Sequence, residues 1–403
     1  MAGEKLLAGP RHALTARPGR ALTAYVGALV VVDLAFATAI IPLLPHYTHA
    51  AALSKAGAGI LIGAYAAGGI AGAVPASLAV GRLGPRTAVL LGLVGVGGAA
   101  LVLGWTTAIA AVAAARFVQG AAGACVWAGG LAWLAGATAP ERRGRVLGVA
   151  MGFAAAGTLA GPAIGALASW AGPGVAFSMA AAVCAVLMAA GLVLRGPGDM
   201  GAVRLLPNWQ MLRDRNVAAG AFLTVLGGAA TGMFSVLAPL RLSQAGAGAL
   251  LIAGVFFAAG AAETASSPLL GRMCDRRGEI AAARLLLAVG AIVSFVFPLL
   301  GPAGWLAVLL AAGLPAYGSL CVPGDTLLSV AAERMRLHQG AVFGLSSLAW
   351  AVGEAAASVT AGAVAQATSD LVPGFLLAGI CLASVVALSP GSPLRPAAER
   401  PVT

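Results

Sequence analysis

The sequence contains little charge. Only 9% of its 403 residues are Asp, Glu, Lys or Arg, whereas 60% are hydrophobic. Average soluble domains carry about 25% charged residues. A soluble protein with this composition would have too few charged residues to cover its surface, even if it had a large core. The composition therefore excludes an ordinary soluble fold and predicts a membrane protein with several spans.

Cysteine is also scarce, and the five cysteines stand singly, without the short spacings of metal sites or a disulfide framework. We expect neither a metal nor a cofactor. The phosphate-binding pattern GxxxxGK[ST] is absent from the sequence, so we do not expect transport driven by ATP hydrolysis. Clustered His and Asp residues, which a membrane enzyme would need, are absent too. We therefore predict that the protein is not an enzyme.

Long apolar runs dominate what is present. Breaking the chain at charged and Gly/Pro clusters leaves twelve runs, each close to the roughly 20 residues that a helix needs to cross a bilayer. They cover residues 21–45, 56–80, 86–104, 107–137, 145–170, 174–194, 217–240, 247–271, 280–300, 303–331, 340–367 and 373–390. The sequence thus predicts an all-α membrane protein. Its expected parts are an N-terminal segment (1–20), a six-helix bundle (21–194), a linker (195–216), a second six-helix bundle (217–390) and a tail (391–403).

The positive charges are distributed unevenly between the two sides of this layout. The termini, the central linker and the even-numbered loops hold 21 of the 24 Lys and Arg residues, whereas the odd-numbered loops hold only Lys55 and Arg241. Arg116 lies inside a span. Cytoplasmic loops are rich in Lys and Arg, so we expect a multi-pass plasma-membrane protein with both termini in the cytoplasm. This topology explains the net charge of +11 without any nucleic-acid partner.

The two halves of the chain repeat one another at an offset close to 196 residues. Gly144, Gly148 and Gly157 align with Gly340, Gly344 and Gly353, and Arg82 and Gly84 align with Arg276 and Gly278 at an offset of 194. Duplicated halves are an arrangement found in secondary transporters, whose substrate site lies near the membrane midplane. The repeat therefore disfavours a channel or a purely structural helix bundle.

Three short patterns stand out within these halves. The loop after the eighth span reads Gly271-x-x-x-Asp275-Arg276-x-Gly278, and its first-half copy keeps Arg82 and Gly84 but has Gly81 in place of the acid. The fourth span contains Arg116-x-x-Gln119-Gly120. The fifth span contains Gly148, Gly157, Gly161, Pro162 and Gly165.

The loop pattern and the fourth-span pattern resemble signatures of the major facilitator superfamily, and the resemblance covers essentially the whole chain. The fifth-span pattern, together with Asp33 followed by Pro42 and Pro45, is similar to that of twelve-helix drug/proton antiporters, including relatives of the vesicular amine transporters. The resemblance implies the major facilitator fold, in which two pseudo-symmetric six-helix bundles alternate in exposing a central site.

The charged loop after the eighth span could act as a conformational latch. Asp275 and Arg276 lie side by side at the end of that span, where a charge pair can hold two helices together in one state and release them in the other. The alternative is a charged cluster that only fixes topology. Because Gly81 replaces the acid in the first half, we expect the gating charge mainly in the second half.

The glycines of the fifth span are spaced by four residues, so Gly157, Gly161 and Gly165 share one helix face. Such a face lets another helix approach closely, and we expect it to pack against the other half of the protein. Pro162 would keep the helix bent. The alternative is an ordinary span in a glycine-rich protein.

Five ionisable residues lie inside the predicted spans, namely Asp33, Arg116, Glu263, Asp325 and Glu354. A charge at bilayer depth costs about 2.5–3.5 kcal/mol, so these side chains should face the bundle interior and couple protons or bind substrate. Asp33 and Arg116 reach a similar depth and form our candidate ion pair. The alternative for each acid is an interhelical hydrogen bond or a cavity wall. The excess of acids favours a cationic or proton-linked cargo.

Aromatic residues are only 6% of the chain, and several occupy central positions. These aromatics and one polar residue of the fourth span, Gln119, are the candidates for the substrate cavity. The full set is Tyr65, Gln119, Trp127, Phe256, Tyr317 and Trp350. A lone aromatic in a bundle can also be simple packing. We predict a secondary active transporter that exports small lipophilic or cationic compounds in exchange for protons, and expect a monomer whose partners are its substrate, protons and the lipid bilayer. The alternative is a proton-coupled importer of a sugar, an amino acid or another metabolite.

Overall fold

A computed structural model describes residues 20–50, 53–138, 140–194, 213–335 and 339–389. The predicted N-terminal segment, most of the linker and the tail lie outside the described residues. The described chain is helical, and its elements are α1 (Arg20–Ala39), α2 (Leu44–Ala50), α3 (Lys55–Leu83), α4 (Pro85–Trp105), α5 (Ile109–Gly136), α6 (Pro140–Ala171), α7 (Pro173–Val193), α8 (Arg215–Gln244), α9 (Ala249–Arg277), α10 (Glu279–Val296), η2 (Phe297–Leu299), α11 (Ala303–Gly313), α12 (Pro315–Gly318), α13 (Cys321–Arg334), α14 (Gln339–Ala367) and α15 (Leu371–Ala387).

The lengths of these helices fit a membrane protein. Within the described ranges, eleven helical stretches are long and apolar enough to cross a membrane, and α15 is a shorter apolar helix. One of the eleven stretches is the combination of α11, α12 and α13, from Ala303 to Arg334. Large apolar side chains such as Trp170 and Val193 are exposed on the outside of the bundle, as expected for a surface that faces lipid.

Two of the predicted apolar runs contain breaks in the helix, although the second remains one stretch long enough to cross a membrane. The first run, 21–45, ends as a helix at Ala39, and a separate helix α2 begins at Leu44. The tenth run, 303–331, breaks into α11, α12 and α13. Prolines accompany both breaks, Pro42 in the first and Pro315 in the second, because proline has no N–H to continue the helix ladder. Apolar composition, which guided the prediction, does not record such breaks.

Helix α2 packs firmly although it lies outside the spans. The hydroxyl of Tyr47 donates a hydrogen bond to the carbonyl oxygen of Leu103 at the end of α4, over 2.7 Å. Burial raises the pKa of Tyr47 to about 12. The break after Ala39 therefore leads into an ordered element.

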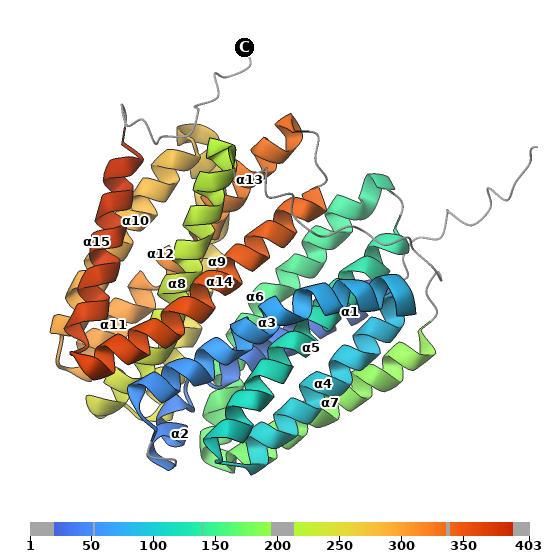
Figure 1. Cartoon of the computed structure of the whole chain (residues 1–403), viewed down its shortest axis with the longest axis horizontal. Helices are drawn as coiled ribbons and strands as arrows, with labels where there is room; N and C mark the ends of the chain where they lie inside the picture. Colours follow the sequence, from blue (N-terminus) through green and yellow to red (C-terminus); the bar gives the residue numbers. More distant parts are fainter. Residues whose placement is uncertain (1–19, 51–52, 139, 195–212, 336–338, 390–403) are drawn as a thin grey trace, which may run out of the picture.

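The helices form two groups (Figure 1), coloured blue to green for α1–α7 and yellow to red for α8–α15. In the first group α3 packs on α5, α4 packs on α5 and α7, and α1 packs on α6. In the second group α8 packs on α14 and α13, and α10 packs on α15. Contacts between the groups run mainly through α3 with α14 and through α6 with α9.

Glycines set the closest approaches within the first group. A Cβ atom added to Gly120 of α5 would lie 1.9 Å from the carbonyl oxygen of Tyr65 in α3, and one added to Gly68 would lie 2.0 Å from that of Phe117. Both distances are far below any allowed contact, so only glycine permits the two backbones to touch. This contact brings Tyr65 of α3 and Arg116 of α5 into one layer.

The glycine stripe of α6 packs within its own half, which corrects the prediction that it meets the other half. A Cβ atom would lie 2.7 Å from the carbonyl oxygen of Val31 at Gly157, 1.8 Å from Thr38 Oγ1 at Gly161, and 2.4 Å from the carbonyl oxygen of Ala39 at Gly165. All three partners belong to α1. Pro162 lies inside α6, which runs unbroken past it. Gly148 also lies in α6, but its surroundings are outside the described part of the structure.

The two groups meet tightly at one end, which we call the Lys55 end. Here α3, α9 and α15 begin and α8 ends. A Cβ atom at Gly59 of α3 would lie 2.3 Å from the carbonyl oxygen of Ser358 in α14, and one at Gly362 of α14 would lie 2.4 Å from that of Lys55. We call the opposite end, where α9 ends, the Asp275 end.

Candidate functional site

Asp33 lies at the centre of the first group, with 1% of its surface exposed. Its Oδ2 accepts hydrogen bonds from the hydroxyl of Tyr65 at 3.1 Å and from Nε1 of Trp127 at 2.8 Å. These donors come from α3 and α5, so three helices converge on one carboxyl group. Gly123 of α5 makes room for it, because a Cβ atom there would lie 2.6 Å from Asp33 Oδ1.

Arg116 is also buried, with 2% of its surface exposed. Its Nη1 donates to Oε1 of Gln119 at 2.8 Å, and its guanidinium lies 4.9 Å from the centre of the Tyr65 ring. Gln119 lies three residues further along α5 and therefore on the same helix face. A cation over an aromatic face is attracted by the ring, the more so away from water.

The predicted ion pair between Asp33 and Arg116 is not formed, because neither of the salt bridges among the described residues includes them. Tyr65 separates the two charges: its ring faces Arg116 and its hydroxyl bonds Asp33. Helix depth, on which the prediction rested, gives no information on the direction in which each side chain leaves its helix. The outcome is a charge pair linked through one tyrosine.

One oxygen of this cluster lacks a partner. Asp33 Oδ1 is buried and makes no hydrogen bond to any of the described residues. A buried acceptor without a partner costs about 1–3 kcal/mol. A carboxyl group whose two oxygens differ in this way can bind a proton or another cationic group on the unpartnered oxygen without breaking its existing bonds.

Glu354 brings a further acid from the second group. It lies on α14, within electrostatic range of both Arg116 and Tyr65. Trp350, one turn earlier, is partly buried against α8, where a Cβ atom at Gly227 would lie 3.2 Å from its ring. The cluster of Asp33, Tyr65 and Arg116 in the first group therefore faces an acid of the second group.

The acids Glu263 and Asp325 lie in the second group, near the break in the tenth span. The carboxyl of Glu263 on α9 fits against Gly318 of α12, where a Cβ atom would lie 2.1 Å from Oε2. Asp325 on α13 accepts a hydrogen bond from the hydroxyl of Ser346 on α14. The thiol of Cys321 is within electrostatic range of both carboxyl groups. None of these acids forms a salt bridge within the described part of the chain.

The sequence model of the Major Facilitator Superfamily matches residues 26–358 of this chain. The chain belongs to the Major Facilitator Superfamily. It is therefore a multi-pass membrane protein in a family of transporters and not of enzymes.

Relatives of this superfamily member include a "Chloramphenicol resistance protein" of Streptomyces lividans, 32% identical over 259 residues, which are 62% of this chain and 66% of the relative. A second is "MFS-type transporter ppzB" of Metarhizium majus, 32% identical over 38% of this chain and 31% of the relative. The matched regions thus span just under two thirds of the first relative and about a third of the second.

Solved structures share the fold. The crystal structure of a D-xylose-proton symporter has a TM-score of 0.71 with 15% identity and covers 93% of this chain and 97% of its own. That of the nucleoside transporter NupG has a TM-score of 0.73 with 13% identity and covers 91% and 98%. At these identities the match establishes the major facilitator fold alone.

The remaining cavity candidates of this superfamily member differ in position. Tyr317 is 1% exposed, and its hydroxyl lies 2.5 Å from both Ser294 Oγ and the carbonyl oxygen of Gly290. Tyr317 therefore belongs to the core of the second group and does not face an open cavity, contrary to our expectation. Phe256 is partly buried and packs on the same core. Gln119 is buried and held by Arg116, so it supports the charge cluster.

The charged loop motif is exposed at the Asp275 end. Arg82, Asp275 and Arg276 are all exposed, and no salt bridge among the described residues includes them. Gly84 and Gly278 have φ angles of 85° and 81°, a left-handed conformation that favours glycine, and each joins two successive helices. Gly271 has open space around it. The repeat in the sequence thus corresponds to one turn built twice, and the residues of the predicted latch form no salt bridge with any other described residue.

Sequence reasoning missed four residues that shape these sites. Gly123 and Gly318 make room for carboxyl groups, Ser346 bonds Asp325, and Asp370 forms the salt bridges at the Lys55 end. Glycine and serine are frequent in this chain, so their positions carried no distinct signal. Asp370 follows the eleventh predicted span, and the two odd-loop cations were the signal that could have found it.

Proposed function

We propose that this chain exports small lipophilic or cationic compounds in exchange for protons. The observation that carries the proposal is the buried carboxyl group of Asp33, which has one oxygen without a partner and is linked through Tyr65 to Arg116. An exchanger needs a group that holds either a proton or its cargo, but not both. The similarity to a protein named for chloramphenicol resistance supports export of a drug-like compound.

In this mechanism Asp33 Oδ1 takes up the proton while Oδ2 keeps its bonds to Tyr65 and Trp127. When the proton leaves, the carboxylate attracts the cationic cargo or the nearby Arg116. Loss of charge at Asp33 changes the field at Arg116 and at Glu354, which lies on the other half. This provides a route by which protonation alters the contact between the two halves.

For the arrangement in the cell, we propose that the Asp275 end faces the cytoplasm, together with both termini. The proposal rests on the excess of Lys and Arg in the loops on that side. The two halves, residues 21–194 and 217–390, would then act as the two moving bodies of a monomeric transporter in the plasma membrane. Lys55 and Asp370 would lie at the outer surface.

The test is transport in proteoliposomes with an imposed proton gradient and a fluorescent lipophilic cation as cargo. We expect movement of the cation against the direction of proton flow in the parent protein. Asp33→Asn should abolish the response to the gradient while it leaves gradient-independent exchange of the cation. Asp214→Asn is a matched control, because Asp214 caps the start of α8 and Asn can cap it equally.

Two results would overturn the proposal. Movement of the cation in the same direction as protons would indicate the importer. An Asp33→Asn variant that still responds fully to the gradient would show that another group carries the proton.

A further inference from the structure

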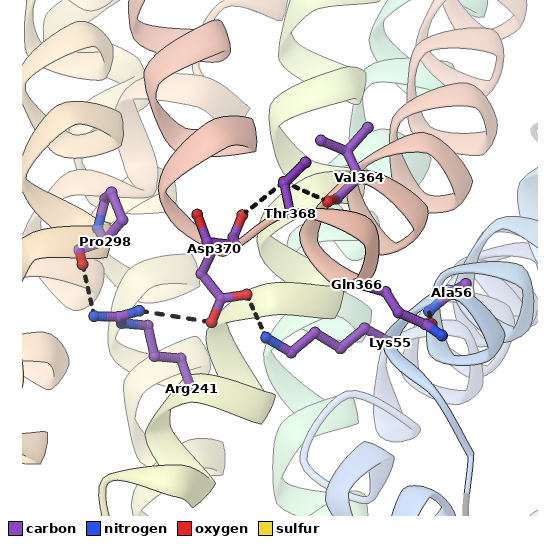
Figure 2. A network of polar contacts seen from close by, with 9 residues as sticks. Lys55, Ala56, Arg241, Pro298, Val364, Gln366, Thr368 and Asp370 are labelled. Atoms are coloured by element: carbon purple, nitrogen blue, oxygen red, sulfur yellow. Dashed lines mark hydrogen bonds and ion pairs between the residues drawn. The ribbon is translucent and has the colours of Figure 1, made fainter.

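The two cations in the odd-numbered loops meet on one carboxyl group. Lys55 at the start of α3 and Arg241 near the end of α8 both contact Asp370, which precedes α15 (Figure 2). Lys55 Nζ lies 2.5 Å from Asp370 Oδ1, and Arg241 Nη1 lies 3.6 Å from Oδ2. We propose that Asp370 and Lys55 form a latch that holds the two halves together at the Lys55 end and must open in each transport cycle.

The latch is rigid on one side only. Arg241 Nη2 donates to the carbonyl oxygens of Pro298 and Leu300, at 2.7 and 2.9 Å, and the guanidinium lies 5.7 Å from the centre of the Phe297 ring. Arg241 is thereby tied to η2 and the residue after it, and keeps Asp370 in place within the second half. Lys55 is the part that comes from the first half, on a flexible side chain whose ammonium can exchange the carboxylate for water.

A second bond across the boundary accompanies this pair. The backbone N–H of Ala56 donates to Oε1 of Gln366 over 3.0 Å. Ala56 lies in the first turn of α3, where amides have no partner within the helix. A side chain of the second half therefore caps a helix of the first half. Water can satisfy both groups after the halves part, so the bond suits a contact that forms and breaks.

Next to the latch the two backbones are in direct contact. Gly59 and Gly63 of α3 face Ser358 and Ala355 of α14, and Gly362 faces the carbonyl oxygen of Lys55. Ser358 is 0% exposed. The polar latch thus lies beside a seal in which the two backbones meet through small residues.

The opposite end of the molecule shows the complementary arrangement. The charged residues of the loop motif, Arg82, Asp275 and Arg276, are exposed there and take part in none of the salt bridges between described residues. Among the described residues, salt bridges across the boundary are therefore found at the Lys55 end and not at the Asp275 end. This is what a transporter closed at the Lys55 end requires, whichever direction its cargo takes. The inference rests on membership of the superfamily and needs neither proton coupling nor export.

The experiment measures access to the seal, without any substrate. The five native cysteines are replaced by alanine, and Ser358→Cys supplies one thiol at the buried boundary. A membrane-impermeant maleimide is added to each side of sealed vesicles separately. Arg276→Cys in the same background, exposed at the Asp275 end, identifies the sides.

We expect Lys55→Met and Asp370→Asn each to raise the labelling rate from the Lys55 side by about threefold to fivefold, the shift expected from one partly exposed ion pair. Lys55→Arg should keep the parent rate, because it preserves the charge. Arg86→Met is the matched control: Arg86 bonds the carbonyl oxygens of Gly191 and Leu192 within the first half, and none of its hydrogen bonds to described residues crosses the boundary.

A variant with a bulky side chain at the boundary tests the packing of the seal independently of the charges of the latch. Gly362→Leu places a side chain where a Cβ atom would already lie 2.4 Å from the carbonyl oxygen of Lys55, and it should raise labelling further than loss of the charge. If Gly362→Leu raises the rate while Lys55→Met and Asp370→Asn leave it unchanged, packing alone holds the halves and the latch is overturned. A rise from the Asp275 side only would overturn it as well.

Discussion

The two halves of this transporter treat their buried charges differently. In the first half, Asp33 and Arg116 lie in one cluster in which a tyrosine, a tryptophan and a glutamine supply the hydrogen bonds. In the second half, Glu263 and Asp325 lie beside Gly318 and Ser346. Among the described residues, only the first cluster contains a cation, Arg116. We therefore expect loss of a charge in the first cluster to disturb transport more than loss of a hydrogen bond to an acid of the second half.

Removal of the buried cation, Arg116, should cause the largest loss of transport. Arg116→Met leaves Gln119 without its donor and Asp33 without its nearby positive charge. Breaking a buried charge cluster by loss of one partner costs about 3–5 kcal/mol, so proton-driven transport should fall by about 100-fold or more. The measurement is the initial rate in proteoliposomes at equal protein content. Arg86→Met controls for the loss of an arginine, and near-normal transport by Arg116→Met would remove the distinction between the halves.

The glycine stripe of α6 offers the next test, because its repeat partner in α14 lacks two of the glycines. Gly161→Leu forces a side chain against Thr38 and the carbonyl oxygen of Ala35, and should destabilise the protein by about 1–3 kcal/mol. The equivalent Ala357→Leu in α14 should cost less, because alanine is already accommodated there. Thermal unfolding in detergent measures both.

Gly152→Ala is the matched control for that test, since nothing lies within 4 Å of a Cβ atom there and α6 should gain or keep stability. A Gly161→Leu variant as stable as Gly152→Ala would contradict the close packing on α1.

The smallest effect is expected in the second half. Ser346→Ala removes the hydrogen bond to Asp325, and one such bond has a net value of about 0.5–1.5 kcal/mol. Asp325 is partly exposed and can bind water instead, so transport should fall by no more than about tenfold. The initial rate of Ser346→Ala is compared with that of Ser319→Ala, which removes a buried hydroxyl that has no partner among the described residues. A loss as large as that of Arg116→Met would show that the second half is equally coupled.

The sequence predicted those features that follow from composition and spacing. Apolar runs located the spans, and the spacing of Gly157, Gly161 and Gly165 predicted that they share a helix face. The helix breaks after Ala39 and Gly313 were not predicted, because the residues there remain apolar while the helix is interrupted. The glycine spacing in α6 identified the helix face made of small residues, but it did not identify the helix that packs against that face.

Contacts between distant residues were the least predictable. Depth along a helix placed Asp33 and Arg116 in one layer, yet the intervening Tyr65 depends on the rotation of three helices. The contact of Lys55 with Asp370 joins residues 315 positions apart, and only packing of the two halves creates it. The unusual location of Lys55 and Arg241 in loops otherwise free of Lys and Arg was its one trace in the sequence.

The broken tenth span has a mechanical consequence. With 11 and 14 residues, α11 and α13 are rods of about 16 and 21 Å, each shorter than the roughly 30 Å of hydrocarbon that they cross together. Neither rod could stay in a membrane as a span by itself. Their alignment depends on α12, whose Tyr317 is fixed to α10 through its hydroxyl and to α8 through the ring of Phe234. A single phenol thus fixes the short connection between the two rods to the neighbouring helices α8 and α10.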